Sequence, residues 1–140
     1  MHAITGSGPA RSGVTLLARI LGNNGNPVTQ ASVSSINYQV TNLSAGTTGT
    51  ATALTVADVI FDSLQQNDLR WTKDDADHPG IDGRHGFNFA ATIPRTQFAA
   101  ATPAVDTPDP VKYQIDVLFT PTTGQAFTQR FLYTAQPVYQ

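Results

Sequence analysis

Near its end the chain alternates between apolar and polar residues, position by position, on both sides of a short turn. The two runs are KYQIDVLF (112–119) and QAFTQRFLY (125–133), and TPTTG lies between them. One phase of the alternation collects the apolar side chains: Tyr113, Ile115, Val117, Phe119, Phe127, Phe131 and Tyr133. A period of two is typical of a strand with one buried face, and a short turn containing glycine joins antiparallel strands. The pattern predicts a β-hairpin with Ile115, Val117 and Phe131 in the core.

Further alternating segments lie upstream and predict strands over 13–21, 33–42, 58–63 and 87–93. Residues 54–64 fit a helical period as well, and we expect a strand there because of their β-branched content. Short turns are predicted over 22–27 and at VTQAS (28–32), and a hairpin or loop over 43–53. PRTQF (94–98) is expected to form a corner in which Phe98 closes one end of the core, and Phe89 is expected inside it.

Composition supports an all-β fold. All ten acidic residues are Asp, and Lys occurs only at positions 73 and 112, so exposed helix formers are scarce. The length of 140 residues suits one domain. We predict a single antiparallel β-sandwich of immunoglobulin-like type, without a disulfide because the chain has no cysteine. A barrel or a jelly roll is the alternative.

Charge and hydropathy exclude two classes of partner. The formal net charge is −2 and no basic cluster occurs, so we expect no nucleic-acid binding. No run approaches the roughly 18 apolar residues of a membrane span, and no apolar stretch suited to a signal peptide follows Met1. We expect no contact with a membrane.

Acids and histidines crowd together only in TKDDADHPGIDGRHGFNF (72–89), which contains Asp74, Asp75, Asp77, His78, Asp82 and His85. Asp75, Asp77 and Asp82 could offer oxygens to calcium, but the ligand spacing of an EF-hand is missing. The two histidines do not form the close pair of a zincin. We therefore predict that 72–86 is an exposed contact or spacer loop, with no metal and no cofactor. Trp71, just before it, is predicted to be a core or boundary anchor.

No motif for catalysis occurs. A nucleophile elbow, a Walker loop and a dinucleotide fingerprint are all missing from the sequence. Asp58, Asp62 and Asp116 lie in strand-like contexts, where each is interpreted as a solvent-facing residue. The sequence predicts no catalytic residue, and we expect that the protein is not an enzyme.

Three phrases together resemble a known group of modules: NGNPVTQASVSSINYQV (24–40), LTVADVIFDSLQQ (54–66) and GFNFAATIPRTQF (86–98). They are similar to small Ig-like modules of phage and prophage structural genes, and distantly to the N-terminal sandwich of phage baseplate upper proteins. The resemblance spans about residues 14–133. The chain departs from the pattern of these modules in one place, the enlarged loop at residues 72–86. The resemblance implies a structural or adhesive role and no catalytic residues.

These observations lead to one functional expectation and one rival. We expect a virion structural protein of a tailed phage, a capsid decoration or cement protein in the first place and a tail or baseplate protein in the second. It would be assembled in the host cytoplasm, with the major capsid protein or tail proteins and further copies of itself as partners. The rival is a bacterial surface Ig-like adhesion or carbohydrate-binding module, which an exposed aromatic row would distinguish.

The domain boundaries follow from the same patterns. Residues 1–12 are predicted to form an extended N-terminal arm, 13–134 the β-sandwich and 135–140 a C-terminal tail. The arm holds few apolar groups, so packing on its own domain would not offset an ordering entropy of about 1–2 kcal/mol per residue. We expect a partner to hold it.

Overall fold

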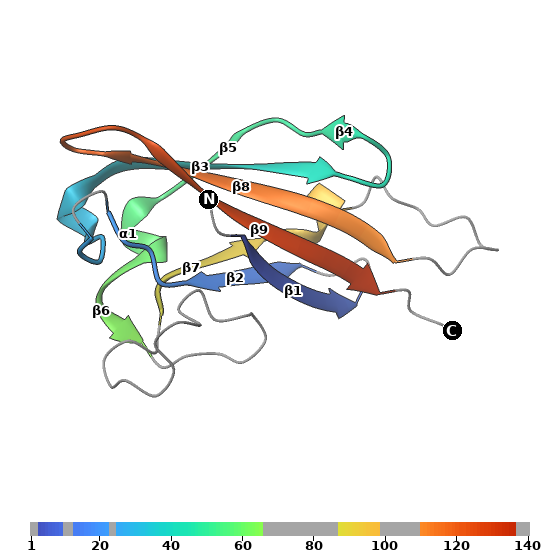
Figure 1. Ribbon diagram of the computed structural model, residues 1–140, viewed down its shortest axis with the longest axis horizontal. Coiled ribbons are helices and arrows are strands. Elements are labelled where there is room, and N and C mark those ends of the chain that lie inside the picture. The colour runs from blue at the N-terminus through green and yellow to red at the C-terminus, as the bar shows by residue number, and fades with distance from the viewer. Residues whose placement is uncertain (1–2, 10–12, 23–24, 66–86, 99–109, 137–140) are drawn as a thin grey trace.

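Two β-sheets packed face to face make up the protein (Figure 1). The computed structural model of the chain describes residues 3–9, 13–22, 25–65, 87–98 and 110–136. Sheet A has the order β1-β9-β8-β3-β4, with β5 also paired to β3, and sheet B has the order β2-β7-β6. The strands of sheet A are β1 (Ile4–Pro9), β3 (Val33–Asn42), β4 (Thr47–Thr48), β5 (Thr52–Leu54), β8 (Val111–Pro121) and β9 (Phe127–Gln136). Those of sheet B are β2 (Val14–Ala18), β6 (Ile60–Gln65) and β7 (Phe87–Ile93).

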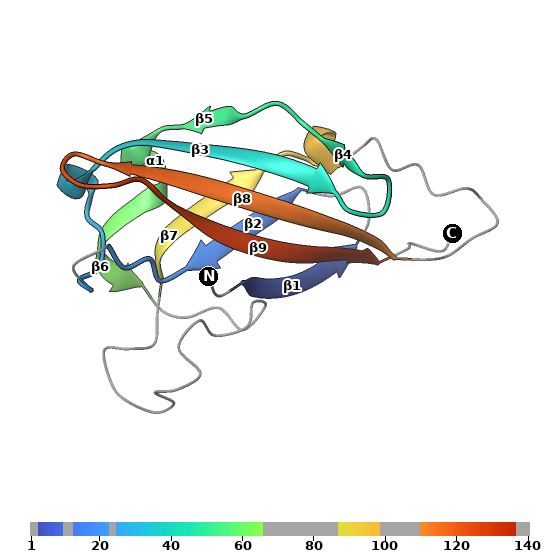
Figure 2. The ribbon, with the colours of Figure 1, turned by 45° about the horizontal axis from the view of Figure 1, so that its top comes forward.

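The strand order is that of an immunoglobulin-like sandwich. Taken as strands B, E and D, β2, β7 and β6 form one sheet, and β9, β8 and β3 take the places of G, F and C in the other. Each neighbouring pair is antiparallel except β1 and β9, which run parallel. Figure 2 shows the two layers one behind the other. The predicted fold class is therefore confirmed.

The alternating residues fill the space between the sheets, as predicted. Phe89, Ile115, Val117 and Phe131 have no exposed surface. The Phe89 ring meets Phe119 edge-on at 5.4 Å between centroids, so β7 of sheet B packs directly on β8 of sheet A. Burial of this kind is the main stabilising contribution in a sandwich of this size.

The predicted hairpin and turns are also present. β8 and β9 are joined by a turn in which Gly124 has a positive φ of 102°, and Phe119 opposes Phe127 at its mouth. The short turn expected in 28–32 is the 3-10 helix η1 (Gln30–Ser32). The corner at 94–98 is a second such helix, η2 (Arg95–Phe98), and Phe98 is buried as predicted.

Tyr113 fixes that corner to the hairpin. Its hydroxyl donates a hydrogen bond to the Phe98 carbonyl at 2.8 Å, and its ring meets the Phe98 ring edge-on. A tyrosine near the start of strand F that bonds back to the chain before it is a feature of immunoglobulin-like folds. Burial raises the pKa of Tyr113 above its ordinary value, and the negative charge of an ionised Tyr133 raises it further.

The N-terminal segment differs from the expected arm. Ile4–Pro9 is strand β1, paired in parallel with β9 from Ile4 opposite Phe131 to Pro9 opposite Gln136. Ile4 is only 1% exposed and is among the largest fully buried side chains. Ladder hydrogen bonds and this one deep anchor supply contacts that apolar content alone did not predict. The boundary at residue 13 is therefore wrong for Ile4–Pro9, which belongs to the sandwich.

Two other boundaries shift by a few residues. Residues 56–59 form one helical turn, α1 (Val56–Val59), and the strand follows as β6 (Ile60–Gln65) instead of 58–63. The turn ends where Ile60 pairs with Phe89 of β7. At the other end β9 continues to Gln136, with Ala135 buried, so the tail does not begin at 135.

Candidate interaction surfaces

The side of sheet A that faces away from sheet B is broad and polar. Residues of β3, β8 and β9 that alternate with the core form it, and we call it the outer face: Asn37, Gln39, Thr41, Gln114, Asp116, Leu118, Thr128, Arg130 and Leu132. The register aligns them in rows across the sheet. Gln39, Asp116 and Arg130 form the middle row.

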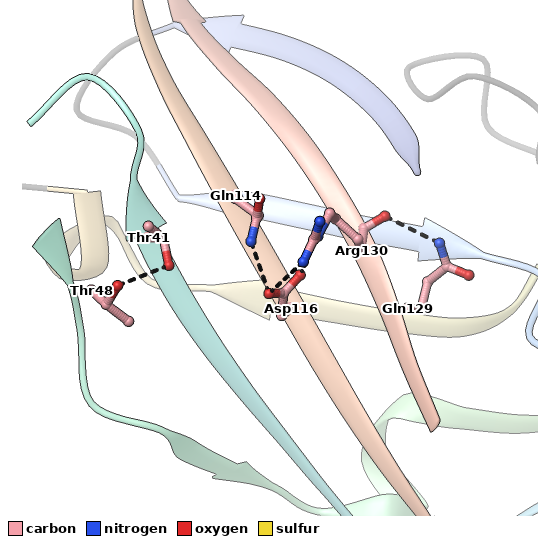
Figure 3. Close-up of polar contacts among 6 residues, drawn as sticks. All are labelled: Thr41, Thr48, Gln114, Asp116, Gln129 and Arg130. Carbon is pink, nitrogen blue, oxygen red and sulfur yellow. Dashed lines mark hydrogen bonds and ion pairs between the residues drawn. The ribbon is translucent and has the colours of Figure 1, made fainter. Parts of the chain in front are cut away.

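An ion pair lies at the centre of the outer face (Figure 3). The Arg130 Nε donates to Asp116 Oδ1 at 2.9 Å, and Gln114 Nε2 donates to Asp116 Oδ2 at 2.9 Å. The hydrogen bond to Asp116, and then its negative charge, raise the pKa of Arg130. Because both side chains are partly exposed, the pair contributes little to folding. It cancels the charge of the two residues on this face.

The outer face offers no convergent catalytic set. Thr41 and Thr48 approach with their hydroxyl oxygens 3.3 Å apart, at the margin of the sheet and without a base beside them (Figure 3). Asp116 is held in place by hydrogen bonds from Arg130 and Gln114. The arrangement can hold a partner through hydrogen bonds and shape.

A hollow of about 280 Å³ opens at one end of the sandwich, between the β2–β3 connection and the β8–β9 turn. Pro27, Val33, Pro121 and Phe127 give it apolar walls, and no described lining residue carries an ionisable side chain. The Ser32 hydroxyl on its wall is occupied: it donates to the Thr29 carbonyl and accepts from the Thr29 N–H. The described walls of the hollow can accept a small uncharged group.

The three aspartates singled out in the sequence lie apart. Asp58 is exposed on α1, Asp62 is exposed on β6, and Asp116 is on β8. Asp62 accepts a hydrogen bond from the Gln30 N–H at 2.8 Å, which ties β6 to η1. Among the described residues no group of three or more histidine and acidic side chains could hold a metal ion. The acids and histidines of 72–86, and Trp71, lie outside the described residues.

Sequence reasoning missed a buried polar residue on β7. Asn88 is 1% exposed, although it lies between the core residue Phe89 and the partly buried Phe87 in a strand of period two. Its Oδ1 accepts from the Ile20 N–H at 2.7 Å, and its Nδ2 donates to the carbonyls of Ile20 and Val28. The side chain thus takes the place of a strand partner where β2 ends. Strand periodicity alone carries no signal for it.

Comparison with known proteins gives no family assignment. No protein-family model, no curated protein and no solved structure matches this chain. Within the described residues no helix has the length and hydropathy to span a membrane.

Proposed function

We propose that this chain is a non-enzymatic structural protein of a tailed-phage virion, bound to the outside of the capsid as a decoration or cement protein. Attachment to the tail or baseplate is the less favoured alternative. The proposal rests mainly on the outer face of sheet A. It is a wide surface built on the most regular strands of the fold, and it combines short polar side chains with the 39%-exposed Leu118 and a neutralised ion pair. The face therefore has no net charge and carries an exposed apolar side chain and an arginine, a residue type enriched where proteins bind one another.

The rival function, a carbohydrate-binding surface module, finds less support in the described part of the chain. A sugar packs its C–H face on an exposed aromatic ring. The described aromatic side chains are all buried or half-buried, and the described exposed large apolar residues are leucines: Leu21, Leu43 and Leu118. The outer face therefore favours a protein partner over a glycan.

A particle-binding experiment tests the proposal. Phage particles are prepared from a strain in which the gene for this chain is disrupted, and the purified chain is added back. We expect that the heads still assemble and that the chain rebinds to them until its sites are saturated. Heads that fail to assemble, or that do not rebind the chain, would contradict a decoration role.

A matched pair of variants locates the contact. Leu118→Asp places a charge in the outer face of sheet A, and Thr92→Asp places one at an exposed position of β7 in sheet B. Both should fold, since both positions are exposed, and equal melting temperatures check this. We expect at least a tenfold weaker binding to heads for Leu118→Asp and unchanged binding for Thr92→Asp. Equal binding of the two variants would remove the outer face from the proposal.

A further inference from the structure

One margin of sheet A is formed by two short, exposed strands. β4 and β5 both pair with β3, and neither pairs with another described strand. We call the segment from Thr47 to Leu54 the β4–β5 edge; Figure 2 shows it along one border of the sheet. Residues 47–51 and Ala53 are exposed. An edge strand leaves every second N–H and C=O group pointing away from its sheet, where another strand can bind them.

The edge is held in a fixed position by bonds to β3. The Gly49 N–H donates to the Val40 carbonyl at 2.8 Å, and Gln39 Nε2 donates to the Gly49 carbonyl at 2.8 Å. These bonds span the interruption between β4 and β5. A docking strand would therefore meet a backbone that is already ordered, which lowers the entropic cost of binding.

The edge lacks two of the usual protections against pairing, charged residues and proline. Natural edges carry charged residues or proline that keep other strands away. Between Arg19 and Asp58 the sequence contains no charged residue and no histidine, and between Pro27 and Pro79 it contains no proline. The protection that the β4–β5 edge does have is the short length of its two strands and the interruption between them at Gly49–Ala51.

The other described edge strands are covered by another element, buried, or interrupted by glycine and proline. The β6 edge is occupied by η1: Gln30 Nε2 donates to the Ile60 carbonyl at 2.9 Å, and the Gln30 N–H donates to Asp62. β1 contains Gly6 and Gly8 and ends at Pro9. In β2 all residues but Thr15 are buried. The β4–β5 edge is thus the described edge that combines exposure, neutrality and order.

We propose that the β4–β5 edge is the surface through which two copies of this chain associate, by antiparallel pairing of the edge with itself. An antiparallel ladder is two-fold symmetric, so an open edge is complementary to its own copy. Because the edge is uncharged, the two-fold axis brings no like charges together. Pairing consumes the edge on both copies, so the assembly closes as a dimer with one sheet running through it.

This inference names a surface for the self-association that we expect from the sequence, and it does not depend on the virion. It is tested on the purified full-length chain by sedimentation equilibrium and by hydrogen exchange. We expect a concentration-dependent dimer in which those amides of Thr47–Leu54 that point away from β3 exchange at least tenfold more slowly than in the dilute monomer. Attachment to heads is measured separately, so failure of one proposal is distinguishable from failure of the other.

Charged variants give the decisive comparison. The double variant Ala51→Lys, Ala53→Lys adds two positive charges to the edge, and the control Thr123→Lys, Ala126→Lys adds the same charge at exposed positions of the β8–β9 turn. We expect the edge variant to raise the dimer dissociation constant at least tenfold and the control to leave it unchanged, with equal melting temperatures. A chain that stays monomeric at about millimolar concentration would overturn the proposal. So would a dimer that the edge lysines do not weaken, or slowed edge exchange that needs a virion protein.

Discussion

Asn88 shows how much a single buried amide can contribute. Its side chain accepts from the buried Ile20 N–H and donates to the Val28 carbonyl, and it gives a second hydrogen bond to the Ile20 carbonyl, which also accepts from the Val28 N–H. We expect Asn88→Ala to lower the free energy of unfolding by about 2–3 kcal/mol, because unsatisfied buried groups are costly. Denaturant unfolding measures this. Thr92→Ser, at an exposed position of the same strand, keeps the hydroxyl that contacts Thr15 and should cost no more than about 0.5 kcal/mol. Equal losses in the two variants would contradict the role of Asn88.

Tyr113 makes stability depend on alkaline pH. Burial raises its pKa in the folded state, so its contribution is complete below the unfolded value of about 10 and is lost as the pH rises through the folded value. We expect the free energy of unfolding to fall above pH 10, and to fall less steeply in Tyr113→Phe. At neutral pH this variant should lose about 1 kcal/mol, the net contribution of its hydrogen bond to Phe98. Parallel pH profiles of the two proteins would contradict this account.

Among the elements, β1 was the least predictable. Its sequence ITGSGP contains one large apolar residue, and a parallel partner 127 residues away in the chain, as for Ile4 and Phe131, leaves no local signal. The strands with a period of two were predictable because one of their faces is buried against the other sheet. The same limit applies to the outer face, since polar residues alternate there whether or not they form an ion pair. The hairpin register places Asp116 opposite Arg130. This register depends on the geometry of the turn, which the sequence pattern alone did not determine.

The integration of β1 into sheet A can be measured. Ile4→Ala should cost about 2–5 kcal/mol, the usual range for truncating a fully buried aliphatic side chain. Gly8→Ala should also destabilise the fold, because an added Cβ would lie 2.5 Å from the Tyr133 hydroxyl oxygen. Ser7→Ala, on the exposed phase of the same strand, is the control and should cost no more than about 0.5 kcal/mol. An unchanged melting temperature for Ile4→Ala would show that the segment is an arm after all.

The connection between β6 and β7 carries a separate prediction. We propose that residues 72–86 act as a contact or spacer element without a bound metal, because their aspartates and histidines lack ligand spacing. Calorimetric titration with calcium and with zinc should give no binding heat. A micromolar site that is lost in the Asp75→Ala, Asp77→Ala variant would contradict the proposal.

At the scale of the whole molecule, the two proposed surfaces are arranged so that both can be used at once. The outer face lies on the broad side of sheet A and the β4–β5 edge lies along its margin (Figures 2 and 3). A dimer formed through the edge would present two outer faces on one extended sheet. Two linked faces bind a surface with repeated sites more tightly than either face alone, provided that their spacing matches. A capsid offers such repeated sites.

The central claim is that the protein is a virion component, and the composition of the particle tests it most directly. The proposal requires a phage genome that encodes this chain. Particles of that phage are purified and analysed by quantitative mass spectrometry, with the major capsid protein as the internal standard. A decoration protein predicts a fixed ratio between the chain and the major capsid protein that persists through repeated density-gradient purification. If the chain is missing from pure particles, or if its amount falls with each purification step, the claim is contradicted.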